Sequence, residues 1–97
     1  MSDSQLAGDS GIVVYSSPFC GYCAAAKALL HAKGTGFEEI DVIADPERRR
    51  EMIARCGRRT VPQIFIGTTH IGGYDDLHAL DANGGLEPLL ANRLADA

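Results

Sequence analysis

Residues 11–33 decide the fold, and they read GIVVYSSPFCGYCAAAKALLHAK. The β-branched run at positions 12–14 is typical of a buried strand. Residues 24–33 are rich in alanine, leucine and lysine, which favour a helix. Cys20 and Cys23 therefore lie where a strand pattern gives way to a helix pattern.

The positions of the two cysteines predict different roles for them. The first backbone N–H groups of a helix have no partner within the helix, and the helix dipole places partial positive charge there. Because Cys20 falls at or just before the first turn, these groups favour its thiolate, and we predict that it is the nucleophile. Cys23 lies one turn further along the same face and deeper, so we expect it to be less acidic and to resolve disulfides formed at Cys20.

Two other interpretations of this cysteine pair were weighed. A structural zinc site needs two further ligands, and the remaining candidates, which form no second closely spaced pair, are Cys56, His31, His70 and His78. The other alternative is that both cysteines are small apolar residues of the core. We favour the redox interpretation over both.

Length and composition restrict the class of protein. The 97 residues suffice for one domain, with a flexible tail expected at residues 1–10 and the domain at residues 11–97. A net charge of −4 disfavours nucleic acid as a partner, and no run approaches the roughly 18 apolar residues that span a membrane. Three cysteines, two of them close together, do not resemble a secreted disulfide framework, so we expect a cytoplasmic protein.

The rest of the chain continues the alternation of strands and helices. Asp45 and Pro46 are typical of a helix start, and Asp75 or Asp76 is expected to cap a later helix. The order strand, helix, strand, helix indicates a βαβ unit in an α/β fold. The expected strands are 37–42, 63–66 and a short one from His70, and the expected helices are 47–56, one ending near Leu80, and 86–94 with Leu86, Leu89, Leu90 and Leu94 facing inward.

Three motifs in order make the chain resemble a glutaredoxin. They are Cys20-Gly21-Tyr22-Cys23, Thr60-Val61-Pro62 and Gly72-Gly73-Tyr74-Asp75-Asp76. The resemblance covers nearly the whole length from Gly11 and extends to the small bacterial dithiol members. It implies a thioredoxin-like fold, with a four-stranded mixed sheet flanked by helices and a cis peptide bond before Pro62.

The resemblance also implies a glutathione site. The Val61 backbone would pair with glutathione in antiparallel fashion, and the amides that begin the Tyr74-Asp75 helix would bind its γ-glutamyl carboxylate. Asp75 would meet the ammonium group, and Tyr22 would contact the ligand. The residues expected to bind glutathione are Tyr22, Arg49, Arg59, Thr60, Val61, Pro62, Gly73, Tyr74 and Asp75.

Basic residues are concentrated in one part of this acidic chain. Six of the nine lysines and arginines lie between positions 48 and 59. Arg49, Arg58 and Arg59 match the cationic side chains that meet the glycyl carboxylate of glutathione in the family. We interpret Arg48, Arg50 and Arg55 as a solvated helix face.

Two positions depart from the family pattern. Ser17 stands where a lysine is common, which removes a positive charge that favours the thiolate. Gly21 stands where proline is usual, and members with a small residue there resemble a subgroup that holds a [2Fe-2S] cluster between two subunits, with the nucleophilic cysteine of each and two glutathiones as ligands. In this chain the cluster ligand would be Cys20.

The resemblance therefore implies a glutathione-dependent thiol-disulfide oxidoreductase. Its substrates would be protein disulfides and glutathionylated proteins, and the working form would be a monomer. The alternative is a cluster-bridged homodimer that stores the cluster, transfers it or senses the redox state. A generic thioredoxin is disfavoured, because Tyr22 lies between the cysteines and the motif from Gly72 to Asp76 is present.

Overall fold

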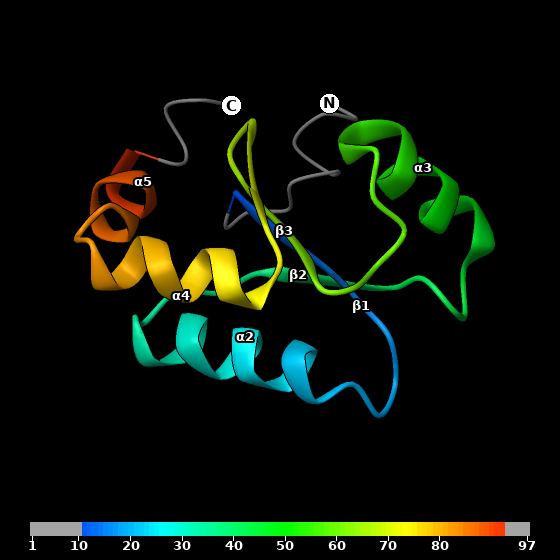
Figure 1. Cartoon of the computed structure of the whole chain (residues 1–97), viewed down its shortest axis with the longest axis horizontal. Coiled ribbons are helices and arrows are strands. Elements are labelled where there is room, and N and C mark those ends of the chain that lie inside the picture. Colours follow the sequence, from blue (N-terminus) through cyan, green and yellow to red (C-terminus); the bar gives the residue numbers. More distant parts are fainter. Residues whose placement is uncertain (1–10, 93–97) are drawn as a thin grey trace.

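The computed structural model describes residues 11–92, so the expected tail at residues 1–10 lies outside the described part. Strands and helices alternate along the first half, a hairpin follows, and two helices end the described chain (Figure 1). Within this range no helix combines the length and the apolar composition needed to cross a membrane. The elements are β1 (Ile12–Ser16), α2 (Gly21–Ala32), β2 (Glu38–Asp41), α3 (Pro46–Cys56), β3 (Gln63–Ile66), β4 (Thr69–Gly72), α4 (Tyr74–Ala82) and α5 (Leu86–Asn92).

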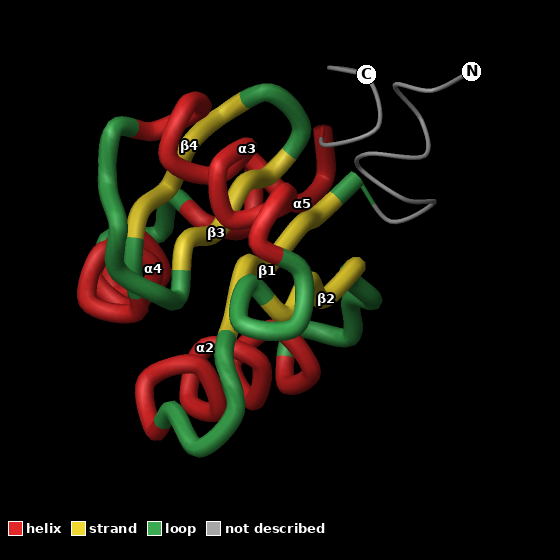
Figure 2. Tube along the Cα trace, turned by 90° about the vertical axis from the view of Figure 1, so that its right-hand side faces the viewer, coloured by secondary structure: helices red, strands yellow, loops and turns green. Residues whose placement is uncertain are grey.

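The four strands form one mixed sheet in the order β2-β1-β3-β4. β1 and β2 are parallel and are joined by α2, which confirms the expected βαβ unit. β1 is antiparallel to β3, and β3 is antiparallel to β4 across a tight turn in which Gly67 has a φ of 60°. Figure 2 shows these strands side by side as the central layer of the molecule.

Helices cover both faces of the sheet. Alternate residues of a strand point to opposite faces, so the uninterrupted apolar run of β1 supplies two cores. The core shared with α2, α4 and α5 contains Ile12, Val14, Ala26, Leu30, Ile64, Ile66, Leu77, Leu86 and Leu90. The core shared with α3 contains Val13, Tyr15, Ile40, Val42, Met52 and Phe65.

A polar network joins α3 to its face of the sheet. The Tyr15 hydroxyl donates a hydrogen bond to Glu51, and Arg55 Nη1 donates to the Tyr15 oxygen at 2.8 Å. The Arg55 guanidinium carbon also lies 3.8 Å from the centroid of the Phe65 ring. Arg55 is exposed, as expected for a solvated helix face, and its charged group also packs on an aromatic ring of the core.

One helix begins where the sequence predicted and another does not. α2 begins at Gly21, directly after Cys20 as expected, and the Cys20 sulfur accepts a hydrogen bond from the Cys23 amide there. The expectation that Asp75 or Asp76 caps α4 was wrong, since the N-cap residue is Gly73 and the helix continues to Ala82. In α5, Leu86 and Leu90 are buried as expected, whereas Leu94 lies outside the described residues.

Candidate active site

The two cysteines of the motif lie at the N-terminus of α2, directly after β1. Cys20 is the N-cap residue, with φ −106° and ψ 111°, and Cys23 lies within the first turn. The Cys23 amide donates to the Cys20 sulfur over 3.2 Å, so one of the unpaired N–H groups of the helix points at that sulfur. This is the contact between the helix N-terminus and the Cys20 sulfur that the sequence analysis expected.

Burial separates the two thiols. Cys20 is half-buried, whereas Cys23 is only 1% exposed. Burial, and then the hydrogen bond with Cys20, raises the pKa of the Cys23 thiol from 9.0 to about 11. Cys23 therefore keeps its proton near neutral pH.

The Thr60-Val61-Pro62 segment leads into β3, and the peptide bond between Val61 and Pro62 is cis, as expected. The side chain of Gln63, a residue that is only 1% exposed, stabilises this segment through hydrogen bonds to Thr60. Its Nε2 donates to the Thr60 carbonyl oxygen at 3.1 Å and to the Thr60 hydroxyl at 3.2 Å. Its Oε1 lies 2.7 Å from His70 Nε2, so the His70 nitrogen is the donor.

The start of α4 is built from two glycines and an aspartate. Asp76 Oδ2 accepts a hydrogen bond from the Gly73 amide at 3.0 Å and another from Arg58 Nη1 at 3.4 Å. The hydrogen bond from Gly73, and to a smaller extent Arg58, lowers the pKa of Asp76. Gly72 has a φ of 119°, and a Cβ there would lie 2.2 Å from Asp76 Oδ2. The positive φ and the close approach of Asp76 both favour glycine at position 72.

A groove of about 230 Å³ separates the Thr60-Val61-Pro62 segment from the start of α4. We call it the Val61 groove. The Tyr22 and Tyr74 rings stack in it with their centroids 6.3 Å apart, so the residue between the cysteines reaches its wall. Its lining residues are Tyr22, Arg58, Thr60, Val61, Pro62, Gln63, Gly73, Tyr74, Asp75 and Asp76.

The Val61 groove gathers seven of the residues predicted to bind glutathione and leaves out two. Tyr22, Thr60, Val61, Pro62, Gly73, Tyr74 and Asp75 line it, whereas Arg49 and Arg59 are not among its lining residues. The cation that lines it is Arg58. The sequence pattern had indicated all three arginines, and only the fold distinguishes them.

Three lining residues make contacts that the sequence analysis had not predicted. Gln63 positions Thr60, Asp76 accepts a hydrogen bond from the amide of the N-cap residue Gly73, and Arg58 bonds to Asp76. The pattern Gly73-x-x-Asp76 has the spacing of a capping box with glycine as the N-cap. This spacing could have predicted the hydrogen bond between the Gly73 amide and the Asp76 carboxylate. No local signal pairs Gln63 with Thr60, because the contact depends on how the chain enters β3.

The zinc interpretation finds no support among residues 11–92. They contain no group of three or more histidine, cysteine or acidic side chains placed to hold a metal ion. Cys56 lies at the far end of α3, where its thiol donates weakly to the Arg58 carbonyl at 3.7 Å. The two cysteines of the motif thus remain a pair without further protein ligands within the described chain.

Known proteins are similar to this chain in sequence and in fold. A family model described as Glutaredoxin matches residues 12–71. Glutaredoxin 3 of Escherichia coli K12 is 54% identical over 81 residues, which is 84% of this chain and 98% of the relative. The crystal structure of the buckwheat glutaredoxin-glutathione complex is 32% identical, with a TM-score of 0.84, and the match covers 99% of this chain and 90% of that chain.

A further solved structure, described as "Metal Binding of Glutaredoxins", is 57% identical to this chain. Its TM-score is 0.63, and the match covers 81% of this chain and 86% of that one. The family model spans more than half of the chain, and the relatives match it over most of their own length. This chain therefore belongs to the glutaredoxin family, with a thioredoxin-like fold and the activity of a thiol-disulfide oxidoreductase.

Proposed function

We propose that this protein is a glutathione-dependent oxidoreductase that reduces protein disulfides and glutathione mixed disulfides. The observation that carries the proposal is the Val61 groove, whose wall includes Tyr22, a residue between the two motif cysteines. The groove combines an exposed backbone segment, a helix N-terminus and an arginine. Glutathione is a short peptide with two carboxylates and one ammonium group, so each of these features has a matching group on it.

The chemistry of the groove fits glutathione group by group. The first N–H groups of α4 have no acceptor within the helix, and the amides of Tyr74 and Asp75 suit the γ-glutamyl carboxylate. The Asp75 carboxylate suits the ammonium group, and the Val61 backbone suits the peptide of the cysteinyl residue. Arg58 suits the glycyl carboxylate, with Arg49 and Arg59 as the predicted alternatives. The solved buckwheat relative is a glutathione complex, which supports the assignment.

Two reaction routes follow from the cysteine geometry. In the one-thiol route, the Cys20 thiolate attacks the glutathione sulfur of a mixed disulfide, the substrate sulfur leaves as a thiolate, and a second glutathione releases Cys20 as glutathione disulfide forms. In the two-thiol route, Cys20 forms a disulfide with a protein substrate. Cys23 then loses its proton and attacks Cys20, which releases the substrate thiol, and two glutathiones reduce the resulting Cys20–Cys23 disulfide.

The Asp75→Asn variant tests the proposed glutathione site. Removing the negative charge removes the interaction with the ammonium group, and we expect the KM for a small glutathione mixed disulfide to rise about tenfold, with kcat within about twofold. The control is Glu47→Gln, the same chemical change at a carboxylate of α3 that is outside the groove and 86% exposed. A KM that rises equally in both variants, or in neither, would count against the proposed site.

A second candidate function is the binding of a [2Fe-2S] cluster between two copies of the chain. One observation favours it: a Cβ added at Gly21 would meet nothing within 4 Å, so the surface beside Cys20 is open to a partner. Residues 11–92 of one chain contain no group of three or more side chains placed to hold a metal ion. Each chain would therefore contribute Cys20 as one cluster ligand, and the Cys20 of a second chain and two glutathione thiolates would be the other ligands. The relative whose description names metal binding is 57% identical to this chain.

The Gly21→Pro variant separates the two functions without disturbing the fold. Proline is well tolerated at the first position of a helix, and the extended backbone of Cys20 is the conformation that a residue before proline requires. We expect the variant to keep its rate on a glutathione mixed disulfide within about threefold, because the nucleophile is unchanged. If the cluster forms in the natural protein, the visible absorption after anaerobic reconstitution with iron, sulfide and glutathione should fall severalfold in the variant.

The control for this test is Gly21→Ala, which keeps a small side chain at the same position. Its absorption after reconstitution should match that of the natural protein. A colourless natural protein that elutes as a monomer would remove the cluster function and leave the oxidoreductase intact. The monomeric state and the domain limits at residues 11–97 remain predictions. We also propose a cytoplasmic location, because the reaction needs a pool of reduced glutathione.

A further inference from the structure

A second groove adjoins Cys20, and the reaction with glutathione proposed above does not use it. It lies between the start of α2 and the end of β2, with a volume of about 490 Å³. We call it the Phe19 groove. Its lining residues are Ser16, Ser17, Pro18, Phe19, Cys20, Gly21, Ala24, Lys27, Glu39 and Asp41. The Val61 groove shares none of these residues, so the two grooves are distinct surfaces, and Cys20 itself lines the Phe19 groove.

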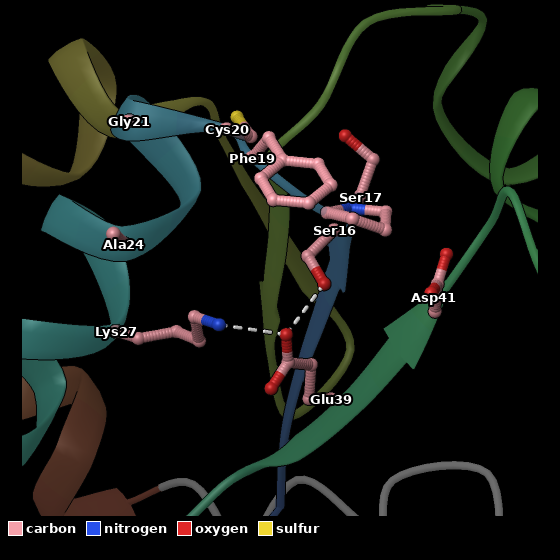
Figure 3. Close-up of a pocket in the computed structure, with 10 residues that line it drawn as sticks. Ser16, Ser17, Phe19, Cys20, Gly21, Ala24, Lys27, Glu39 and Asp41 are labelled. Carbon is pink, nitrogen blue, oxygen red and sulfur yellow. Dashed lines mark hydrogen bonds and ion pairs between the residues drawn. The ribbon is translucent and has the colours of Figure 1, made fainter.

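Phe19 stands at the edge of this groove in an unusual conformation. It is the single non-glycine residue with positive φ, at 58°, within residues 11–92. Its side chain is also fully exposed, at 107% of the reference value. A bulky residue rarely adopts this backbone conformation, and strained residues of this kind concentrate at functional sites. In Figure 3 the Phe19 ring lies beside the Cys20 side chain. Such a ring offers an apolar anchor next to the reacting sulfur.

The floor of the Phe19 groove is acidic on balance. Glu39 Oε2 accepts hydrogen bonds from the Ser16 hydroxyl at 2.7 Å and from Lys27 Nζ at 2.8 Å, as Figure 3 shows. Asp41 stands beyond them at the end of β2, where its Oδ1 accepts from two backbone amides. The hydrogen bond from Lys27, and then that from Ser16, lowers the pKa of Glu39. The groove thus contains two acidic side chains, Glu39 and Asp41, and one basic side chain, Lys27.

The two grooves have the same formal charge and differ in the backbone groups that they offer. Each is lined by one basic and two acidic side chains, and Arg58 of the Val61 groove is bonded to Asp76. The Val61 groove also offers the amides at the start of α4, which suit the carboxylates of glutathione, whereas the Cys23 amide beside the Phe19 groove is bonded to the Cys20 sulfur. In the Phe19 groove, Lys27 is already paired with Glu39, and Asp41 adds a further negative charge. A second glutathione, which carries two carboxylates, is disfavoured there. A peptide with a basic side chain is favoured.

We propose that the Phe19 groove binds the polypeptide of a disulfide substrate that carries a basic residue beside its reactive cysteine. This proposal rests on the oxidoreductase function and names the substrate class of its two-thiol route. The Cys20 thiolate forms a bond to one sulfur of the substrate disulfide, and the other sulfur leaves as a thiolate. The chain that flanks the captured sulfur then packs on Phe19, with its basic group near Glu39 and Asp41.

Capture by the Cys23→Ser protein tests the proposal, because its Cys20 forms a peptide disulfide that Cys23 cannot resolve. The probes are two symmetrical peptide disulfides, identical except for an arginine or a glutamate next to the cysteine. Mass spectrometry of the adducts gives the ratio of the two capture rates, arginine peptide over glutamate peptide. The same ratio is measured for the reaction of each peptide disulfide with free 2-mercaptoethanol, and dividing the first ratio by the second gives a corrected ratio that is free of the intrinsic reactivity of the peptides. We expect the arginine peptide to be captured about fivefold faster, with a smaller preference at high salt.

Two substitutions on the Cys23→Ser background assign the effect to the Phe19 groove. Glu39→Gln removes one charge and should bring the corrected ratio close to one. Phe19→Asn keeps a residue that tolerates positive φ but removes the ring, and it should slow the capture of both peptides about threefold or more. With Cys23 restored, both single variants should keep the rate on a small glutathione mixed disulfide within about twofold of the natural protein.

The outcomes distinguish this proposal from the proposed function. A corrected ratio near one in the parent protein, or a preference that Glu39→Gln does not change, would overturn the proposal while the glutathione reaction stands. If Glu39→Gln or Phe19→Asn changes the dependence of the rate on free glutathione but leaves peptide capture unchanged, the Phe19 groove is a second glutathione site. That result would also overturn the proposal. Loss of the proposed function would show as inactivity of the natural protein on the glutathione mixed disulfide.

Discussion

Cys20→Ser should lower the reduction rate of both a protein disulfide and a glutathione mixed disulfide by at least about 1,000-fold, because a serine hydroxyl does not supply the thiolate. Cys23→Ser should abolish the first activity and keep the second within about threefold, since the one-thiol route needs only Cys20 and glutathione. Steady-state rates on the two substrates, with free glutathione as the reductant, measure both effects.

Cys56→Ser is the matched control for these two variants. Cys56 lies at the end of α3, outside both grooves, and its replacement should leave both rates unchanged. Equal loss of the glutathione mixed disulfide reaction in Cys20→Ser and Cys23→Ser would contradict the assigned roles. So would a Cys20→Ser protein that still forms a mixed disulfide through Cys23.

Gly72→Ala should produce the largest loss of stability and of glutathione affinity among the glycine substitutions. The residue has a φ of 119°, and its new Cβ would lie 2.2 Å from Asp76 Oδ2. Asp76 would have to move, which breaks its hydrogen bonds to the Gly73 amide and to Arg58 at the start of α4. We expect the free energy of unfolding to fall by about 2–4 kcal/mol and the KM for a glutathione mixed disulfide to rise about tenfold or more.

Gly84→Ala separates the two causes of this loss. Gly84 also has a positive φ, of 79°, but a Cβ there would meet nothing within 4 Å. We expect it to lower the free energy of unfolding by about 1–2 kcal/mol through backbone strain alone and to leave the KM unchanged. Denaturant unfolding and the same kinetic assay measure both variants. Equal destabilisation by the two substitutions would show that the contact with Asp76 contributes nothing.

Local patterns in the sequence predicted much of the fold. The β-branched run of β1, the Asp45-Pro46 start of α3 and the leucines of α5 each act over a few residues, so they can be recognised without tertiary information. The start of α4 was harder to predict because two aspartates follow the glycines. Gly73 takes the N-cap position, while Asp76 bonds back to it from within the helix. Composition alone favoured an aspartate at the cap.

The contacts that shape the site are long-range in sequence, which is why the sequence did not reveal them. Glu39 reaches Lys27 across twelve positions because β2 lies beside the helix that follows β1. Arg58 meets Asp76 across eighteen positions and lines the Val61 groove, whereas the sequence analysis had assigned Arg49 and Arg59 to the glutathione site. The glutathione motifs were predicted through the resemblance, and the acidic Phe19 groove emerged only when β2 and α2 were brought together.

The position of glutathione on the protein is the most direct test of the proposed function. Cys23→Ser protein labelled with nitrogen-15 can be converted to the Cys20–glutathione mixed disulfide, and its amide chemical shifts can be compared with those of the reduced protein. We predict that, beyond the residues next to Cys20, the largest shifts occur at Val61, Tyr74 and Asp75 in the Val61 groove. Largest shifts at Lys27, Glu39 and Asp41, with the Val61 groove unchanged, would contradict the proposed binding mode.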